Sequence, residues 1–330
     1  MDVDAFIDVH RGDWQRLDEL VGRRRLSGPE SDELLMLYQR VSTHLSIIRS
    51  VDPESAVSGA LSMRLSRART RFTGARSDAV EDLARFFVRS LPAALYRIRW
   101  PTVVVGVLFV VVAWLFAGWV IGTPGVIRAL GTDEELRRYV EQDFVDYYSE
   151  NPAASFAGLV WTNNAWLAVQ AVAFGVTGVW PVHILYQNAQ GIGLAAGMMA
   201  SYDRLDVFFV YILPHGFLEL TAIFVATAAG LRIFWAWVAP GRRRRSEALP
   251  QEGRALITVA LGLVPVLLVS GLVEGFVTPS GLPPWLRLTI GFLVFAAFWA
   301  YTLVLGRRAV LAGYGGDLDA VDRGDGLITA

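Results

Sequence analysis

The sequence predicts an all-α fold, namely a polytopic α-helical membrane protein with about six transmembrane helices and a helical cytosolic N-terminal region. Three observations predict it. The chain is 54% hydrophobic and has a positive mean hydropathy, which sets it apart from ordinary soluble domains. Beyond residue 100, apolar stretches of about 20 residues recur, the length that crosses a bilayer. The 30 basic residues are all Arg and gather between those stretches.

Residues 1–76 are predicted to form a cytosolic helical region, with helices near 3–26, 29–51 and 53–72. Pro29 and Pro53 stand where proline suits the first turn of a helix. In the second helix, apolar residues recur at helical spacing, which predicts one buried stripe. Its members are Leu34, Leu37, Tyr38, Val41, Leu45 and Ile48.

A basic run follows in the third of these helices and just beyond it. It consists of Arg64, Arg67, Arg69, Arg71 and Arg76, with no acid among them. Such a run is either a solvated helix face or a contact for anionic lipid headgroups or a protein partner. Its closeness in sequence to the first membrane segment favours headgroups or a partner. We expect no nucleic-acid partner.

Residues 77–100 are predicted to form an amphipathic helix that lies in the membrane interface. The segment starts with a cap and early acids, and Arg then alternates with Phe, Leu and Tyr. Arg97, Arg99 and Trp100 are suited to anchor it at the headgroup level. The helix should lead directly into the first span.

The predicted membrane domain, 101–308, contains six spans. Their expected ranges are 101–121, 155–175, 182–200, 207–231, 255–277 and 288–306. The second and third are the least apolar, because Asn and Gln interrupt them. The tail 309–330, which contains several Gly, is expected to be disordered.

Arg counts set the expected orientation. Segment 232–254 holds six Arg, whereas 122–154 holds three Arg and seven acids. The positive-inside rule then places both termini in the cytoplasm and 122–154 outside, with LRRYVEQDFVDYY as a short surface helix. The sequence therefore predicts a multi-pass protein of the bacterial cytoplasmic membrane.

One predicted span, 207–231, carries ionisable residues. His215 and Glu219 are four residues apart, so they share a helix face. An ionisable group at the bilayer centre costs on the order of 2.5 to 3.5 kcal/mol, so it needs a partner or a wet cavity. Pro214 precedes this pair and frees a backbone carbonyl in the turn before it.

Polar residues of other spans converge on the same layer. Counting the helical rise puts them roughly 12 to 22 Å below the outer surface, and Glu274 lies shallower, between Gly271 and Gly275. The candidate intramembrane polar site comprises Asn163, Asn164, Asn188, His215, Glu219 and Glu274. The alternative is that the amides only join helices by hydrogen bonds.

Glycines gather in the third predicted span. Gly191, Gly193 and Gly197 either form a small-residue packing face or mark a broken helix that lines a cavity.

The composition excludes some chemistry. Because the chain has no Cys, disulfides, thiolate catalysis and Cys-ligated zinc or iron–sulfur sites are ruled out. There is no HExxH motif, no second well-placed His and no obvious nucleophile. We therefore assign no catalytic, cofactor-binding or metal-binding residues and expect no cofactor.

Three blocks carry a resemblance to a known family. TNNAWLAVQAVAFGVTGVWP, LPHGFLELTAIFVATAAG and EGFVTP follow one another after a basic helical N-terminal region. Through these three blocks, roughly residues 75–306 resemble the stage II sporulation protein M family of integral membrane proteins. The resemblance extends to Asn163, Asn164, Asn188, Pro214, His215, Gly216, Glu219, Glu274 and Pro279. It implies a septal membrane protein that helps to localise peptidoglycan-degrading partners, although this chain has a longer N-terminal region and an extended Arg-rich loop.

Three function classes follow. The first is a non-enzymatic scaffold that recruits partners in cell-envelope remodelling, the class that the resemblance favours. The second is a permease-like transporter or transporter subunit, which midplane carboxylates and a Gly-rich span favour. The third is an intramembrane metal-dependent hydrolase, with His215, Glu219 and Glu274 as ligands. Whether the chain forms a homo-oligomer stays open.

Overall fold

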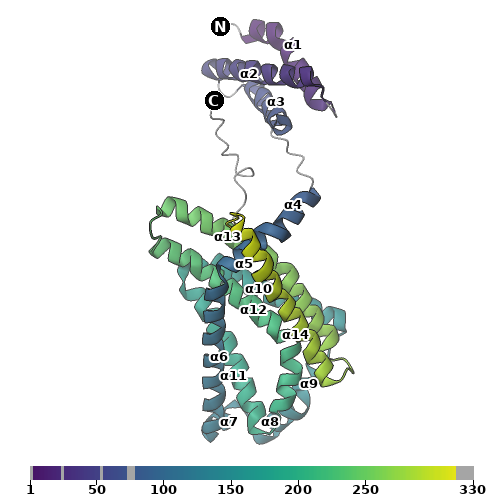
Figure 1. Ribbon diagram of the computed structural model, residues 1–330, viewed down its shortest axis with the longest axis vertical. Helices are drawn as coiled ribbons and strands as arrows, with labels where there is room; N and C mark the ends of the chain where they lie inside the picture. The colour runs from purple at the N-terminus through teal and green to yellow at the C-terminus, as the bar shows by residue number, and fades with distance from the viewer. Residues whose placement is uncertain (1–2, 24–25, 53–54, 73–78, 317–330) are drawn as a thin grey trace. The chain divides into compact units, whose positions relative to one another are not determined.

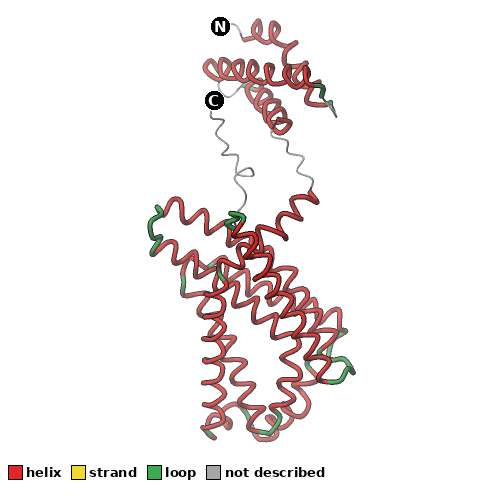
Figure 2. The backbone as a smooth tube through the Cα atoms, viewed as in Figure 1, coloured by secondary structure: helices red, strands yellow, loops and turns green. Residues whose placement is uncertain are grey.

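The computed structural model describes residues 3–23, 26–52, 55–72 and 79–316, and every regular element in these ranges is helical (Figure 1). Figure 2 shows these helices joined by short loops. The all-α prediction is thereby confirmed. The chain divides into two units, Met1–Leu83 and Ala84–Ala330.

The N-terminal unit is built from three helices: α1 (Val3–Gly22), α2 (Gly28–Val51) and α3 (Ala56–Phe72). They enclose a core of their own, formed by Trp14, Leu17, Leu20, Leu34, Leu37, Val41, Ile48, Leu61, Leu65 and Ala68. The stripe predicted for α2 is confirmed, since four of its residues are in this core. Tyr38 and Leu45 pack against it from the sides.

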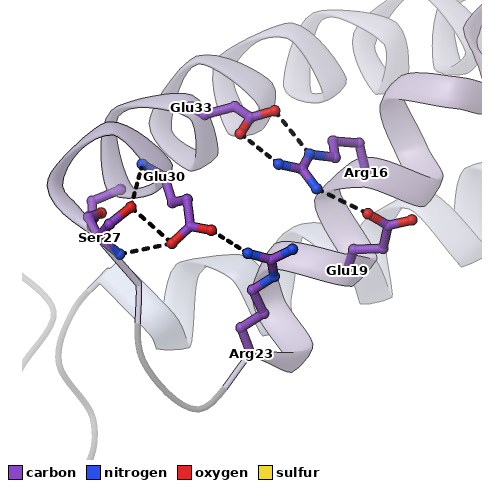
Figure 3. A network of polar contacts seen from close by, with 7 residues as sticks. Arg16, Glu19, Arg23, Ser27, Glu30 and Glu33 are labelled. Atoms are coloured by element: carbon purple, nitrogen blue, oxygen red, sulfur yellow. Dashed lines mark hydrogen bonds and ion pairs between the residues drawn. The ribbon is translucent and has the colours of Figure 1, made fainter.

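Polar contacts fix the turn between α1 and α2 (Figure 3). The Ser27 hydroxyl accepts from the Glu30 N–H at 3.4 Å, and the Glu30 carboxylate accepts from the Ser27 N–H at 2.8 Å. This reciprocal capping satisfies donors at the helix start. Arg16 of α1 donates to both carboxylate oxygens of Glu33 on α2, each at 2.8 Å, a paired geometry that adds specificity.

The basic run of α3 is only partly described. Arg64 Nε donates to Asp18 Oδ2 at 2.8 Å and so joins α3 to α1. Arg67 and Arg69 are exposed. The Arg71 side chain and all of Arg76 lie outside the described residues. Contact with anionic headgroups stays a prediction.

Four helices of the second unit are long and apolar enough to cross a membrane. They are α6 (Arg99–Gly122), α12 (Leu205–Val238), Arg245–Val277 and Pro284–Leu311. The third comprises α13 (Arg245–Leu272) and a π-helical turn (Val273–Val277). The fourth comprises α14 (Pro284–Ala300), a π-helical turn (Tyr301–Leu305) and α15 (Gly306–Leu311). These helices correspond to four of the six predicted spans, which therefore have the expected length and apolarity.

The other two predicted spans are helices of the same unit, but they are less apolar because of their Asn and Gln. α10 (Ala153–Ala173) begins beside the end of α13, where a Cβ at Gly275 would lie 2.7 Å from Ala153 O. It ends beside α12, where a Cβ at Gly230 would lie 2.4 Å from Ala171 O. α10 therefore runs alongside α12 and α13 over much of their length.

α11 (Val179–Ser201) runs back in the opposite direction. Near its start Pro181 packs against Gly230 of α12, and near its end a Cβ at Gly197 would lie 2.9 Å from Ala117 O of α6. Gly193 approaches Ala113 O in the same way, at 2.4 Å. The predicted small-residue face is thus confirmed for Gly193 and Gly197, whereas Gly191 faces open space.

Residues preceding α6 enter the core of this unit. After α4 (Ala79–Arg85) and a π-helical turn (Phe86–Ser90), α5 (Leu91–Arg97) has residues 91–95 buried. A Cβ at Gly262 would lie 2.2 Å from the Leu91 side chain. Because the helix faces in contact carry glycine and alanine, α5 packs closely between α13 and α15. Because α5 is buried, it does not suit the membrane interface that was predicted for 77–100. For α4 the interfacial position stays a prediction.

The structure describes the chain up to Gly316. The first part of the predicted tail, 309–316, is therefore placed. α15 ends at Leu311, and Arg89 Nη1 donates to Tyr314 Oη at 2.6 Å. The carbonyl of Gly315 accepts from Arg97. The remainder of the predicted tail, 317–330, lies outside the described residues.

The segment between α6 and α10 forms α7 (Pro124–Leu130), α8 (Asp133–Arg138), a π-helical turn (Tyr139–Asp143) and α9 (Phe144–Asp146). The short helix expected here is present. Its apolar side buries Val140 and Phe144 against Met199 and Phe208. This contact brings the following residues, Tyr147 and Tyr148, towards α12.

Candidate functional site

Three of the predicted polar residues meet between α12 and the end of α13. His215 and Glu219 lie one turn apart on α12, as their spacing predicted. Glu274 lies in the π-helical turn Val273–Val277, whose wider winding ends α13. His215 and Glu274 are each 5% exposed, so both are buried within the unit.

The three side chains form a compact cluster. His215 Nε2 lies 3.8 Å from Glu274 Oε1. One donor atom from each of His215, Glu219 and Glu274 falls within 4.8 Å of the others. The Glu219 carboxyl lies in hydrogen-bonding distance of the Glu274 carboxyl. Two acids and a histidine are therefore gathered around one point.

Two polar residues support Glu219. Asn164 of α10, 8% exposed, and Ser270 of α13, 1% exposed, both place their side chains beside its carboxyl group. The Ser270 hydroxyl also lies 3.2 Å from the backbone carbonyl oxygen of His215. The cluster consequently joins three helices, α10, α12 and α13.

Thr278 determines which His215 nitrogen faces the acids. The Thr278 hydroxyl lies 3.2 Å from His215 Nδ1 and donates to Val273 O at 3.4 Å. The hydroxyl therefore holds the imidazole ring through Nδ1. The other ring nitrogen, Nε2, faces Glu274 Oε1.

Aromatic and basic residues close one side of the site. The Tyr148 and His215 rings have centroids 5.9 Å apart. Burial, with the Glu274 carboxylate nearby, raises the pKa of Tyr148 well above its ordinary value. Arg287 of α14 donates from Nη1 to Thr278 O at 2.6 Å and stacks over the Tyr211 ring, 5.2 Å from its centroid.

The remaining predicted site residues lie elsewhere. Asn163 is exposed and does not face the cluster. Asn188 donates from Nδ2 to Ile184 O of its own helix at 2.9 Å. Of the six predicted residues, the structure therefore brings four together: Asn164, His215, Glu219 and Glu274.

Sequence reasoning missed Ser270, Thr278, Arg287 and Tyr148. Arg287 offered a usable signal, because an Arg inside an apolar helix is by default a functional or pairing residue. Thr278 stands within the EGFVTP motif itself. Ser270 and Tyr148 carried no signal that distinguishes them from other small polar or aromatic residues.

The two neighbouring amides predict different mutational effects. Asn164→Leu should lower the free energy of unfolding by about 1 to 3 kcal/mol, because the buried Glu219 carboxylate loses a hydrogen-bond donor. Asn163→Leu should change it by less than about 0.5 kcal/mol, as is usual for exposed positions. Thermal unfolding of the two purified variants checks this. Equal midpoints would show that Glu219 does not depend on Asn164.

Comparison with known families gives two matches. Residues 102–279 match the family described as Stage II sporulation protein M, over more than half of the chain. Residues 4–74 match a second family, described as Domain of unknown function (DUF8413). No curated protein and no solved structure matches the chain. The first match contains all six predicted site residues, and the second covers the N-terminal unit up to residue 74.

Proposed function

The chain belongs to the stage II sporulation protein M family, and from this premise we propose that it is a non-enzymatic membrane protein that recruits partners for remodelling of the bacterial cell envelope. One observation carries the proposal. The N-terminal unit has a core of its own and its own family match, outside the membrane-family region. A separately folded unit attached to a membrane unit is what a recruiting protein needs.

We further propose six spans with both termini in the cytoplasm. Four helices have the expected apolarity, and the close contacts of α10 and α11 with α6, α12 and α13 support two more crossings. At 21 and 23 residues, α10 and α11 have the length of a span. Most of their Asn and Gln, namely Asn164, Gln170, Asn188 and Gln190, are buried or partly buried within the unit, which membrane helices tolerate at a modest cost. The Arg-rich loop before α13 then lies inside, in accordance with the positive-inside rule.

Partner capture tests the recruiting role. Full-length protein and a variant lacking residues 3–72 are each purified from their native bacterium through a tag on the C-terminus. Peptidoglycan hydrolases should co-purify with the full-length protein at least about tenfold more than with the shortened one, with both proteins equally abundant in membranes. Equal recovery, or recovery with neither, would contradict a recruiting role for the N-terminal unit.

A second candidate is a permease-like transporter, favoured by the buried cluster of His215, Glu219 and Glu274. Titratable groups at membrane depth are typical of ion and substrate pathways. Glu219→Gln separates the two candidates, because Gln keeps the shape and the hydrogen-bonding capacity but removes the charge. For a transporter the variant should be abundant and inactive in cells, whereas for a scaffold it should behave as the unmodified protein.

A further inference from the structure

The cluster on α12 and α13 brings together three side chains that can each donate an electron pair to a cation. His215 directs Nε2 to Glu274, and Glu219 and Glu274 contribute carboxylate oxygens. The second oxygen of each Glu, Oε2, is buried and has no hydrogen-bond partner. Buried carboxylates without compensation are costly, so the arrangement calls for a positive species at its centre.

Arginine does not supply that charge. Among the residues that the structure describes, no Arg forms an ion pair with Glu219 or Glu274. Arg287, on the neighbouring helix, directs Nη1 to Thr278 O and its guanidinium face to Tyr211. The positive species must therefore be a proton or a metal ion.

A single proton satisfies the cluster incompletely. Shared between Glu219 and Glu274, it leaves His215 Nε2 at 3.8 Å from Glu274 Oε1, which is too long for a hydrogen bond in either tautomer. It also leaves both buried Oε2 atoms without a partner. A metal ion, by contrast, accepts electron pairs from all three side chains at once.

We propose that His215, Glu219 and Glu274 bind one divalent metal ion, for which Zn²⁺ is the best match. Imidazole nitrogen and carboxylate oxygen are ligands that zinc prefers. Ligand atoms around tetrahedral zinc stand about 3.4 Å apart at bond lengths of about 2.0 to 2.1 Å. Donor atoms within 4.8 Å of one another need only small side-chain movements to reach that geometry.

The polar residues around the cluster are placed as they are around the ligands of metal sites. Thr278 holds His215 through Nδ1 and thereby aims Nε2 at the acids. Asn164 and Ser270 lie beside the Glu219 carboxyl on two other helices, and the Ser270 hydroxyl donates to His215 O at 3.2 Å. Hydrogen bonds of this outer kind orient ligands and raise metal affinity.

A second group of similar composition shows the contrast. His10, Asp13 and His44 also have donor atoms within 4.8 Å of one another. However, His44 Nδ1 accepts from Trp14 Nε1 at 3.1 Å, and Asp13 pairs with Arg40 at 3.2 Å. Two of its three side chains are thus already engaged, so we assign no metal there.

The test uses full-length protein purified in detergent, stripped with a chelator, incubated with Zn²⁺ and desalted. Elemental analysis should find about one zinc per chain, and Zn²⁺ should raise the thermal midpoint of the stripped protein. Glu274→Gln should abolish both effects. His183→Ala, which removes an exposed His, should change neither and controls for zinc on the surface.

A milder variant keeps the test decisive if Glu274→Gln fails to fold. Thr278→Val preserves side-chain volume and all three ligands but removes the hydroxyl that orients His215. It should weaken zinc binding by about 10- to 100-fold. Absence of zinc from folded, unmodified protein would overturn the proposal in favour of a shared proton. Unchanged zinc affinity in both variants would show that the metal binds elsewhere.

Discussion

Glu252→Leu is expected to destabilise the membrane unit by about 3 kcal/mol, the lower end of the cost of breaking a buried ion pair. Glu252, on α13, is 3% exposed. Its Oε2 accepts from Arg232 Nε at 2.6 Å. Its Oε1 accepts from Arg243 Nη2 at 3.1 Å and from Arg97 Nη2 at 3.4 Å.

The substitution removes the carboxylate that three guanidinium groups share and leaves these groups close together. They come from α5, α12 and the loop before α13, so their mutual repulsion acts on three segments. The Arg side chains are 23% to 38% exposed, and their contact with water keeps the cost at the lower end. Thermal unfolding measures the effect. Glu247→Gln, exposed and on the same helix, is the control, and an equal midpoint for both variants would contradict the expected role of Glu252.

Gly291→Leu is expected to cost at least about 3 kcal/mol, the upper end of ordinary overpacking. A Cβ at Gly291 of α14 would lie 2.1 Å from Pro214 O and 2.6 Å from Pro214 Cα. Because the obstacle is backbone, no side-chain rotation relieves the clash, and α14 must move away from α12. Arg287, one turn earlier on α14, would then lose its hydrogen bond to Thr278 O.

Gly118→Leu is the matched control, since a Cβ at Gly118 of α6 meets nothing within 4 Å. It should fold and accumulate in membranes as the unmodified protein does. Folded yield by size-exclusion chromatography and thermal midpoint distinguish the two variants. A normal yield and midpoint for Gly291→Leu would show that α14 and α12 are not in close contact at Pro214.

Much of the site was predictable because helical spacing fixes faces. His215 and Glu219, four residues apart, share a face in any helix, and the depth of Asn164 placed it in the same layer. Depth does not determine rotation about the helix axis, however. Asn163 and Asn164 differ by about 100° around α10, so only one of them faces the cluster, and Asn188 lies at a suitable depth on a face that does not reach it.

Other features depend on contacts that no local pattern contains. The π-helical turn at Val273–Val277 changes the winding of the helix and therefore the direction of Glu274. Glu252 joins residues from three distant segments. The burial of α5 depends on glycines of α13 and α15, which are distant in sequence. The amphipathic pattern of the segment does not contain this information, and it pointed to the membrane interface instead.

The central claim is that α10 and α11 cross the membrane, because only then does the cluster of Asn164, His215, Glu219 and Glu274 lie inside a six-span bundle. The chain has no Cys, so single cysteines report cleanly on sidedness. Exposed positions are available at Ser149 before α10, at Thr177 between α10 and α11, and at Ser246 at the start of α13.

A membrane-impermeant maleimide applied to intact cells or right-side-out vesicles is the most direct measurement. Six spans predict that Ser149→Cys is labelled at once, whereas Thr177→Cys and Ser246→Cys are labelled only after permeabilisation. Thr177 is the decisive position, since four spans place it on the same side as Ser149. Labelling of Thr177→Cys from outside, together with Ser149→Cys, would contradict the six-span bundle.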